Sequence, residues 1–493
     1  MNLDLAAQRA ALTPARPAVR FGEHWYTYAE LNHRAARLAA WLYAQGVGKG
    51  DRVSILAPNH LAHLDLILAT AKLGFIYAPL NYRLSATEQA AIVRYLEPAC
   101  LLSGETQGPP HGFSGTVLSL TDYEAWQTGE ADAEAFPEPD LTPEDTQMIL
   151  LTGGTTGTPK GAMQPYRQGF ANAAATVLSW GLRDDDCAVQ ATPCFHAAVN
   201  ALTLPLLHLG ARVVLQSKFD PADYLRLLVQ ESCTLVFMVP TMFKLLADHP
   251  GFAETDVSRV RWAVSGGAPC PEPVRAAFAS RVVRFKQGYG LTEAGVNCFA
   301  AELDAAAARP ETVGKPILYT EACIRDAEGA PVVHGEVGEL TLRGPHVFSG
   351  YFRRPEATAE ALRDGWLYPG DLAYRDQDGF YYLVGRRKEM FISGGENVFP
   401  AEVERALYEH PAVSECAVLG VPDVRWGEVG LAAVVLAEPI SEDTLRAFLR
   451  ERLATYKVPK HLVFAEALPK NSAGKILKRQ LAEAFVPAGE VSE

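Results

Sequence analysis

The sequence lacks the cysteine spacing of a zinc site or a disulfide framework. Its eight cysteines are scattered along 493 residues, and no two of them form a C-x-x-C pair. Structural zinc sites and small disulfide-stapled folds both depend on clustered cysteines. We therefore expect free thiols and a reducing, cytoplasmic setting for this chain.

An excess of basic residues is also missing. The chain has 45 Lys and Arg against 58 Asp and Glu, which gives a formal net charge of −13. Non-specific binding to nucleic acid requires a positive surface that neutralises phosphates. The composition therefore argues against a nucleic-acid partner, although a local basic site for a nucleotide remains compatible with it.

No uninterrupted apolar run is long enough to span a membrane. The most hydrophobic stretch covers residues 61–80, but His63, Asp65 and Lys72 interrupt it. A transmembrane helix needs about 20 consecutive apolar residues, so this stretch predicts an amphipathic or buried helix instead. The first residues show no basic region followed by an apolar one, and we expect no signal peptide.

The first 300 residues alternate between strand and helix patterns. Thr27 and Glu30 have the spacing of a capping box, which predicts a helix start. Short apolar segments separated by helical patterns predict a largely parallel sheet covered by helices. The expected strands are residues 52–57, 211–215, 235–239, 261–265 and 282–285. Residues 105–145 are rich in Gly, Pro and acids, which predicts loops.

The pattern changes after about residue 310. Residues 336–343 and 379–384 read as shorter, paired strands, and a helix after Pro400 opens a further unit with strands at 416–420 and 431–436. The fold class that we predict is α/β, with a large N-terminal domain of helix-covered sheets plus a β-rich subdomain. A small, mobile α+β C-terminal domain follows. We place the two domains at residues 1–387 and 388–493.

The densest chemical signal is the segment LTGGTTGTPKG at residues 151–161. Its glycines let backbone N–H groups approach phosphates, its threonines add hydroxyl groups, and Lys160 adds a positive charge. The segment is not a Walker A motif, because Lys160 follows Pro159 and Gly161 stands where Ser or Thr would hold Mg²⁺. The sequence therefore predicts a site for a triphosphate on a different loop type.

Further motifs follow in a fixed order. They are SGGAP at 265–269, QGYGLTE at 287–293, GWLYPGD at 365–371, GRRKE at 385–389, SGGEN at 393–397 and PKNSAGK at 469–475. In this order they resemble the acyl-adenylate-forming superfamily, the AMP-binding enzymes that include acyl-CoA synthetases, luciferases and peptide-synthetase adenylation domains. The resemblance covers nearly the whole chain, and several motifs in order are difficult to explain by chance.

The resemblance implies that ATP and Mg²⁺ bind to the N-terminal domain. The implied nucleotide contacts are Thr152, Gly153, Gly154, Thr155, Thr156, Gly157, Gly266, Gly267, Ala268, Gln287, Gly288, Tyr289, Gly290, Asp371 and Arg386. Tyr289 would stack on adenine, and the carboxylate of Asp371 would accept hydrogen bonds from the ribose hydroxyls. Glu293 and Thr155 would bind Mg²⁺.

The resemblance also implies the catalytic groups and a moving domain. Lys160 and Thr292 would bind phosphates, and Lys475 would bridge the carboxylate and the α-phosphate. Lys388 would be the hinge of the C-terminal domain. Coenzyme A would contact Gly394, Gly395, Trp426 and Lys460 in the thioester-forming state.

The acid would bind near His196, in a pocket shared with Val239, Thr241 and Gly267. Amino-acid-activating relatives carry Phe-Asp where this chain has Phe195-His196, so we expect an acid without an α-amino group. The small apolar neighbours of His196 favour an apolar acyl tail. A medium- or long-chain fatty acid is our first expectation, with an aryl acid or o-succinylbenzoate as the alternatives.

Two positions depart from the family pattern. Gly153 stands where the family usually has Ser, and Pro369 stands where it usually has Thr. Each change removes a hydroxyl group, and proline also fixes φ. Neither position belongs to the central catalytic set, but both could alter the affinity for ATP.

The motifs together predict an ATP-dependent acid–thiol ligase. It would form an acyl-adenylate with release of pyrophosphate and then an acyl-CoA thioester with release of AMP. Three alternatives remain open at this point: an amino-acid adenylation or carrier-loading module, a luciferase-like oxidase, and a non-catalytic nucleotide sensor. Whether the thiol acceptor is coenzyme A or a carrier protein also stays open, as does a homodimer.

Overall fold

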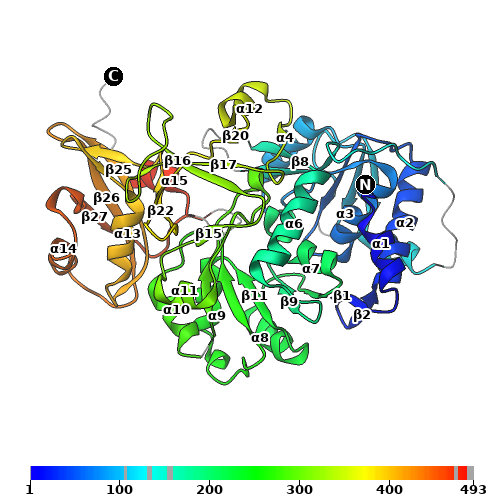
Figure 1. Ribbon diagram of the computed structural model, residues 1–493, viewed down its shortest axis with the longest axis horizontal. Helices are drawn as coiled ribbons and strands as arrows, with labels where there is room; N and C mark the ends of the chain where they lie inside the picture. The colour runs from blue at the N-terminus through cyan, green and yellow to red at the C-terminus, as the bar shows by residue number, and fades with distance from the viewer. Residues whose placement is uncertain are drawn as a thin grey trace.

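The first 300 residues are organised around two seven-stranded sheets, one of which also includes the later strand β18 (Figure 1). The computed structural model describes residues 2–104, 108–129, 136–152, 159–281, 283–470 and 476–485. In sheet order, the first sheet consists of β13 (Phe285–Gln287), β12 (Trp262–Ser265), β11 (Leu235–Met238), β9 (Cys187–Gln190), β10 (Arg212–Leu215), β1 (Pro17–Phe21) and β2 (His24–Thr27). All neighbouring strands in it are parallel except the β1–β2 hairpin.

The second sheet is mixed. Its order is β18 (Gly350–Tyr351), β8 (Lys160–Pro165), β7 (Thr146–Thr152), β4 (Ile76–Tyr77), β3 (Arg52–Leu56), β5 (Cys100–Ser103) and β6 (Thr116–Ser119). The strands from β7 to β6 are parallel, whereas β8 and β18 are antiparallel to their neighbours. The predicted helix-covered, largely parallel architecture is therefore confirmed, with an antiparallel edge that carries the segment at residues 151–161.

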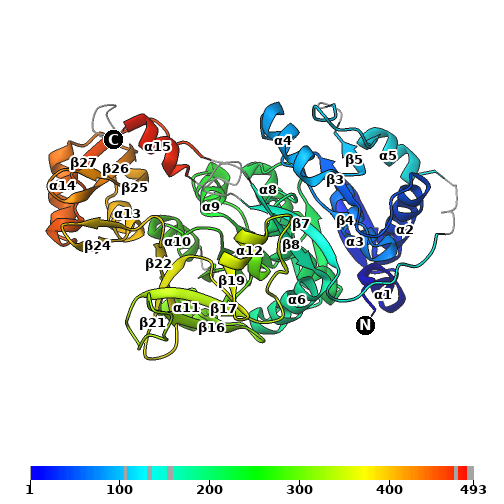
Figure 2. The same cartoon turned by 90° about the horizontal axis from the view of Figure 1, so that it is seen from above.

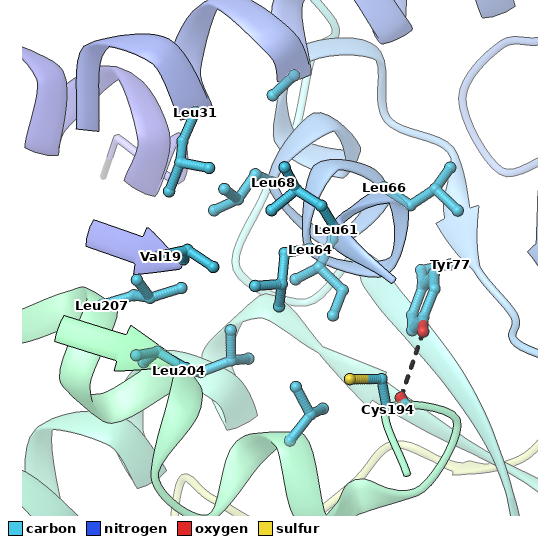
Figure 3. Close-up of a cluster of buried hydrophobic side chains, with 14 of the residues drawn as sticks. Val19, Leu31, Leu61, Leu64, Leu66, Leu68, Tyr77, Cys194, Leu204 and Leu207 are labelled. Carbon is cyan, nitrogen blue, oxygen red and sulfur yellow. Dashed lines mark hydrogen bonds between the residues drawn. The ribbon is translucent and has the colours of Figure 1, made fainter. Parts of the chain in front are cut away.

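Helix α3 (Leu61–Leu73) lies at the centre of the core that joins the two sheets. Figure 3 shows its leucines between Val19 of β1, Leu31 of α2 (Tyr28–Ala44) and Leu204 of α7 (Thr203–Leu209). Asp65 is fully buried in this helix and accepts hydrogen bonds of 2.8–3.2 Å from Arg34. Residues 61–73 of the interrupted apolar stretch thus form a buried helix, as predicted, and its charged residues Asp65 and Lys72 are paired with Arg34 and Asp4. The end of the stretch is not helical, because Ile76 and Tyr77 form β4.

Other local predictions had mixed outcomes. The capping box at Thr27 and Glu30 is present at the start of α2. The expected strand at residues 282–285 is wrong in its bounds, because β13 begins at Phe285 and continues to Gln287. The expectation of loops over residues 105–145 is also wrong in part, since β6 and α5 (Leu120–Gln127) lie within it. Ser119 caps α5 through its side chain, a local signal that the loop-rich composition obscured.

The remaining helices of this part pack around the sheets (Figure 2). They are α1 (Leu5–Leu12), α4 (Ala86–Leu96), α6 (Tyr166–Trp180), α8 (Pro221–Gln230), α9 (Pro240–Ala247), α10 (Glu272–Ala279), α11 (Leu303–Ala308) and α12 (Pro355–Ala361). No helix among the described residues is long and apolar enough to cross a membrane.

A β-rich unit follows, as the sequence predicted. Its six-stranded sheet runs β19 (Leu362–Arg363), β20 (Trp366–Leu367), β17 (Gly338–Arg343), β21 (Asp371–Arg375) and β22 (Tyr381–Arg386), and β16 (Glu321–Arg325) pairs with β17. A short ribbon of β14 (Phe299–Ala300) and β15 (Lys315–Pro316) precedes it. All pairings within these two units are antiparallel.

The last unit has its own sheet at one end of the molecule (Figures 1 and 2). The sheet contains β24 (Glu396–Val398), β23 (Phe391–Ser393), β26 (Gly427–Leu436), β25 (Val413–Asp423) and β27 (His461–Phe464), and the helices are α13 (Pro400–Tyr408), α14 (Glu442–Arg450) and α15 (Lys478–Phe485). Its α+β character is confirmed, while β25 and β26 are longer than the sequence suggested. The boundary at residue 388 stays a prediction.

Candidate active site

The carboxyl ends of neighbouring parallel strands gather most of the predicted site. Met238, Ser265 and Gln287 end β11, β12 and β13 in register with one another. The loops leaving these strands start close together, since Gly266 N donates to Met238 O at 3.2 Å and Gly288 N donates to Ser265 O at 2.8 Å. Ligands of open α/β sheets bind at such carboxyl edges, so this edge is the candidate nucleotide site.

Two glycines at this edge are required for different reasons, Gly290 by close packing and Gly267 by its backbone conformation. A Cβ on Gly290 would lie 1.8 Å from the carbonyl oxygen of Val296, which leaves no space for any side chain. Gly267 has φ +85°, and a Cβ there would lie 3.6 Å from Val239. Gly267 and Val239, predicted to share the acyl pocket, are therefore neighbours, and Thr241 follows in the first turn of α9.

Both polar atoms of the Gln287 side chain are hydrogen-bonded to the backbone at this edge. Its Oε1 accepts from the backbone N of Cys270 at 2.9 Å, and its Nε2 donates to Pro310 O at 2.8 Å. Ala268 lies exposed in the turn after Gly267. The side chain of Gln287, the first residue of QGYGLTE, thus holds the backbone directly after SGGAP, a role that the motif resemblance did not include.

The predicted adenine and ribose residues form one hydrogen-bonded group. The hydroxyl of Tyr289 donates to Oδ2 of Asp371 at 2.6 Å, and Nε of Arg386 lies 3.0 Å from Oδ1 of the same carboxylate. Asp371 and Arg386 are direct partners across the β21–β22 pair. The Asp371 carboxylate holds the pKa of Arg386 above its usual value. A carboxylate offers about four lone-pair sites, so two acceptor sites remain for ribose hydroxyls.

The predicted metal ligand Glu293 is buried beside a tyrosine and near a lysine. Its Oε1 accepts a hydrogen bond of 2.7 Å from the Tyr351 hydroxyl. The ammonium of Lys160 lies 5.1 Å from the centre of the same tyrosine ring. Burial raises the pKa of Glu293 above its ordinary value, because removing the carboxylate from water disfavours its charged form.

This arrangement fits Mg²⁺ held jointly with phosphates. Among the described residues, no cluster of three or more His, Cys, Asp or Glu side chains could hold a metal ion. Mg²⁺ usually takes one or two protein carboxylates and completes its shell with water and substrate phosphates. The single buried carboxylate of Glu293 matches that pattern. The second predicted ligand, Thr155, lies outside the described residues.

The Gly/Thr segment connects the antiparallel strands β7 and β8. Thr152 and Lys160 face each other as the last pair of this hairpin, and the Thr152 hydroxyl donates to Lys160 O at 3.3 Å. The remaining predicted phosphate contacts lie outside the described residues, as does Lys475: they are Gly153, Gly154, Thr155, Thr156 and Gly157.

His196 lies on a tightly held loop after β9. Asn59, in the bend that follows β3, holds this loop. Its Nδ2 donates to Thr192 O at 3.1 Å, and its Oδ1 accepts from Cys194 N at 2.8 Å. The Tyr77 hydroxyl also donates to Cys194 O at 3.3 Å (Figure 3). Because β9 pairs in parallel with β11, this loop reaches the same sheet edge as Val239.

His196 is a neutral imidazole in this setting. Burial, with a smaller contribution from the charge of Arg83, lowers its pKa to about 4. Its Nε2 is buried and has no hydrogen-bond partner among the described residues. A neutral ring of this kind can hydrogen-bond a polar group, but it cannot balance the charge of an ammonium group.

The predicted coenzyme A residues meet in the C-terminal unit. Gly394 N donates to Trp426 O at 2.9 Å, and a Cβ on Gly394 would lie 2.7 Å from the indole ring. The ammonium of Lys460 lies 4.8 Å from the centre of that ring. Gly395 is exposed beside Gly394 in the β23–β24 turn. Gly394, Trp426 and Lys460, separated by up to 66 positions, thus form one surface cluster.

The remaining predictions concern the hinge residue and the two departures from the family pattern. Lys388 is exposed in the turn between β22 and β23, where the chain passes to the last sheet. Pro369 lies next to Gly370, whose carbonyl accepts from Arg387 N at 2.9 Å. Gly153 lies outside the described residues.

Sequence reasoning missed Tyr351 and Gln164. Tyr351 contacts both Glu293 and Lys160, and the Nε2 of Gln164 donates to Thr292 O at 2.8 Å. Neither residue belongs to a recognised motif. Gln164 could have been noticed as a polar residue in the apolar strand that follows Lys160.

Comparison with known proteins identifies the family. The AMP-binding enzyme family matches residues 6–352, and the AMP-binding enzyme C-terminal domain matches residues 402–475. A feruloyl-CoA synthase from an Amycolatopsis species is 43% identical over 486 residues, which cover 97% of this chain and 98% of that protein. A 2-succinylbenzoate–CoA ligase from Geobacillus kaustophilus is 37% identical, with 96% of each chain covered.

Solved structures agree with this result. The o-succinylbenzoate CoA synthetase from Bacillus subtilis, in complex with its acyl-adenylate intermediate, superimposes with a TM-score of 0.89 at 31% identity and covers 97% of each chain. The same enzyme in complex with ATP and magnesium ion gives a TM-score of 0.88, with 97% of this chain and 99% of that chain covered. The chain therefore belongs to the AMP-binding enzyme family and, within it, to the AMP-forming acyl-CoA synthetases.

Proposed function

We propose that this ligase activates an aromatic acid of the hydroxycinnamate type and transfers its acyl group to coenzyme A. The likeness to a feruloyl-CoA synthase at 43% identity over nearly the whole chain carries this proposal. The relatives that act on 2-succinylbenzoate also use an aromatic acid. These relatives favour the aryl alternative over the medium- or long-chain fatty acid that we expected first.

The surroundings of His196 support an acid without an ammonium group. Its imidazole is neutral at neutral pH, because burial lowers its pKa to about 4. An amino-acid substrate would need a fixed anion at this position to balance its charge. A phenol, methoxy or carbonyl oxygen needs only a hydrogen bond or a polar neighbour, which a neutral imidazole supplies.

In the first half-reaction, the acid's carboxylate oxygen attacks the α-phosphorus of ATP and pyrophosphate leaves. Tyr289, Asp371 and Arg386 would bind the nucleoside, and Lys160 would stabilise the charge that develops on the departing phosphates. Lys475 would draw the carboxylate and the α-phosphate together. Bound at Glu293, Mg²⁺ would supply further charge neutralisation. Positioning and electrostatics account for most of the catalysis in phosphoryl chemistry, so no protein nucleophile is required.

In the second half-reaction, the thiol of coenzyme A gives up its proton to water and its sulfur attacks the acyl carbon, the acyl–phosphate bond breaks and AMP leaves with the electron pair. The cluster of Gly394, Trp426 and Lys460 would hold the coenzyme A, with Trp426 stacking on a ring. Lys460, whose ammonium lies 3.7 Å from Asp423, would bind a phosphate. This cluster lies on the unit that follows Lys388. We propose that this unit turns about Lys388 between the two half-reactions.

The test is a panel of acids offered with magnesium-ATP, with and without coenzyme A. The panel contains ferulate, o-succinylbenzoate, dodecanoate and phenylalanine, and AMP and pyrophosphate release are both measured. We expect ferulate to give the highest kcat/KM and phenylalanine to give none. A higher kcat/KM for dodecanoate than for both aromatic acids would overturn the substrate proposal, whereas a higher value for o-succinylbenzoate would keep the aromatic class and reject the hydroxycinnamate assignment.

A further inference from the structure

A buried chain of side-chain amides connects the His196 loop to the Thr292–Glu293 segment. The Nδ2 of Asn200 donates to Oε1 of Gln164 at 3.0 Å, and the Nε2 of Gln164 donates to Thr292 O at 2.8 Å. Asn200 ends the short helix η1 (Ala197–Asn200), which begins directly after His196, and Thr292 begins η3 (Thr292–Ala294). Gln164 on β8 therefore touches both the acid side and the nucleotide side of the site.

The direction of these hydrogen bonds is fixed by chemistry. The carbonyl of Thr292 can only accept, so the amide nitrogen of Gln164 must face it. The amide oxygen then faces Asn200, which must present its own NH₂ group. Gln164 and Asn200 are only 3% and 8% exposed, so water cannot easily replace either partner.

A second glutamine provides an internal comparison. The Nε2 of Gln168 on α6 also donates to Thr292 O, at 3.0 Å, and this residue is 1% exposed. Its Oε1 has no hydrogen-bond partner among the described residues, so it makes no link to η1. The two glutamines therefore share one acceptor and differ in whether they also contact Asn200.

The other end of the η3 segment is tied to the same turn. The Nδ2 of Asn297 donates to Ala201 O at 2.8 Å, directly after Asn200 in the chain. Between these ties, Glu293 O accepts from Phe348 N at 2.9 Å, which fixes the backbone of the predicted metal ligand. A displacement of the turn at Asn200 and Ala201 would therefore also displace the segment that carries Thr292 and Glu293.

We propose that Gln164 is a positioning residue that couples occupancy of the acid pocket to the placement of Thr292 and Glu293. An acid packed against the His196 loop fixes η1, and the Asn200–Gln164–Thr292 hydrogen bonds transmit that constraint to the nucleotide segment. Acid binding therefore tightens the binding of magnesium-ATP. The inference rests on the proposed roles of His196 and Thr292 in the site, and it does not depend on which acid is the substrate.

The experiment compares Gln164→Met with Gln168→Met in the full-length chain. The acid is the member of the panel above that the wild-type protein uses fastest. The apparent KM for ATP is measured by pyrophosphate release at low and at saturating acid. We expect the wild type and Gln168→Met to show a lower KM for ATP at saturating acid, and Gln164→Met to lose most of that dependence. Loss of one buried hydrogen-bonded link corresponds to a change of roughly tenfold.

A double-mutant cycle separates coupling from simple loss of packing. If Gln164 and Asn200 act through one hydrogen bond, Gln164→Met combined with Asn200→Leu should be no worse than the more severe single change. For Gln168→Met combined with Asn200→Leu, the fold-change in the KM for ATP should instead equal the product of the two single fold-changes. Multiplicative effects in the Gln164 cycle, or equal loss of acid dependence in Gln168→Met, would overturn the inference.

Two further measurements keep the result interpretable. Thermal melting is recorded for every variant, and Asn200→Leu replaces Gln164→Met if the latter does not fold, because it removes the same Asn200–Gln164 hydrogen bond from the other side. Acid dependence retained in Asn200→Leu would equally overturn the inference. Thr292→Val tests the site assignment separately: an unchanged KM for ATP in that variant rejects the role of Thr292 while leaving the Gln164 cycle readable.

Discussion

The hydroxyl of Tyr289 donates a 2.6 Å hydrogen bond to the carboxylate of Asp371, which joins the adenine and ribose motifs across 82 residues of sequence. Tyr289 lies in the loop after β13 of the first sheet, whereas Asp371 begins β21 of the β-rich unit. Arg386 contacts the same carboxylate from β22, the strand beside Asp371. The carboxylate that is expected to bind the ribose is therefore oriented by the residue that is expected to contact the base.

We predict that Tyr289→Phe raises the KM for ATP about fivefold and changes kcat little. The ring is kept, but Asp371 loses one of the donors that orient it, and a hydrogen bond typically contributes about 1 kcal/mol net, which corresponds to about fivefold. Tyr28→Phe is the matched control, since its buried hydroxyl donates to Ala211 O at 2.7 Å away from the site. An equal rise in KM for both variants would contradict the assigned role.

We predict that Lys475→Ala lowers the rate of adenylate formation at least hundredfold and largely spares thioester formation from preformed adenylate. Removal of one group that stabilises charge in a transition state typically costs a factor of this size. The two half-reactions are measured by pyrophosphate exchange and by thioester yield. Lys470→Ala, which breaks only an ion pair with Glu415, serves as the control. Equal loss in both half-reactions would reject the division of labour.

We predict the reverse pattern for Lys388→Pro. The turn that contains Lys388 connects β22 to β23, and a hinge must change its backbone angles. Proline fixes φ near −65°, so the C-terminal unit could not turn and thioester formation should fail while pyrophosphate exchange persists. Lys388→Ala removes the charge but keeps the backbone freedom, and it should retain both half-reactions. Failure of that variant too would point to the charge rather than to a hinge.

We predict that Trp426→Ala raises the KM for coenzyme A about tenfold and leaves pyrophosphate exchange unchanged. Trp426 is 38% exposed, packs on Gly394 and lies under the ammonium of Lys460, so its ring is available to a ligand. Loss of an aromatic contact of this kind costs about 1–2 kcal/mol. Arg452→Ala disrupts another cation–ring pair of the same unit, with Phe448, and should leave the KM unchanged.

We predict that activity falls on the acid side through a pKa above the ordinary value of 4.5 for a glutamate. Burial raises the pKa of Glu293, so its carboxylate takes up a proton as the pH falls and its affinity for Mg²⁺ is lost. Because Mg²⁺ competes with the proton, a higher magnesium concentration should move the acid limb to lower pH. His196 should add no inflection between pH 6 and 9, since its pKa is about 4.

The kcat/KM profile of Glu293→Gln provides the check. The amide cannot take up the proton, so any residual activity should show no magnesium-dependent shift of the acid limb. A shift of the same size in this variant would assign the titration to another group.

Local patterns determined the elements and the residues that carry the chemistry. Three of these patterns can be read from neighbouring residues alone. They are the capping box at Thr27 and Glu30, the alternation of short apolar strands with helices, and the change of pattern after residue 310. Such signals depend on hydrophobic periodicity over a few residues and need no knowledge of tertiary contacts. The glycine-rich motifs could be recognised for the same reason, because each motif is a contiguous run of residues.

Only the tertiary structure decided which of these residues meet. The partners Tyr289–Asp371, Tyr351–Glu293 and Asn200–Gln164 lie 82, 58 and 36 positions apart. Their contacts depend on the packing of separate sheets and loops, and no local periodicity encodes that packing. For the same reason, the sequence did not show whether Asp65 is buried or exposed, since its partner Arg34 lies on another helix. The sequence therefore determined the chemical groups of this ligase, and the packing of its sheets decided how they are oriented and coupled.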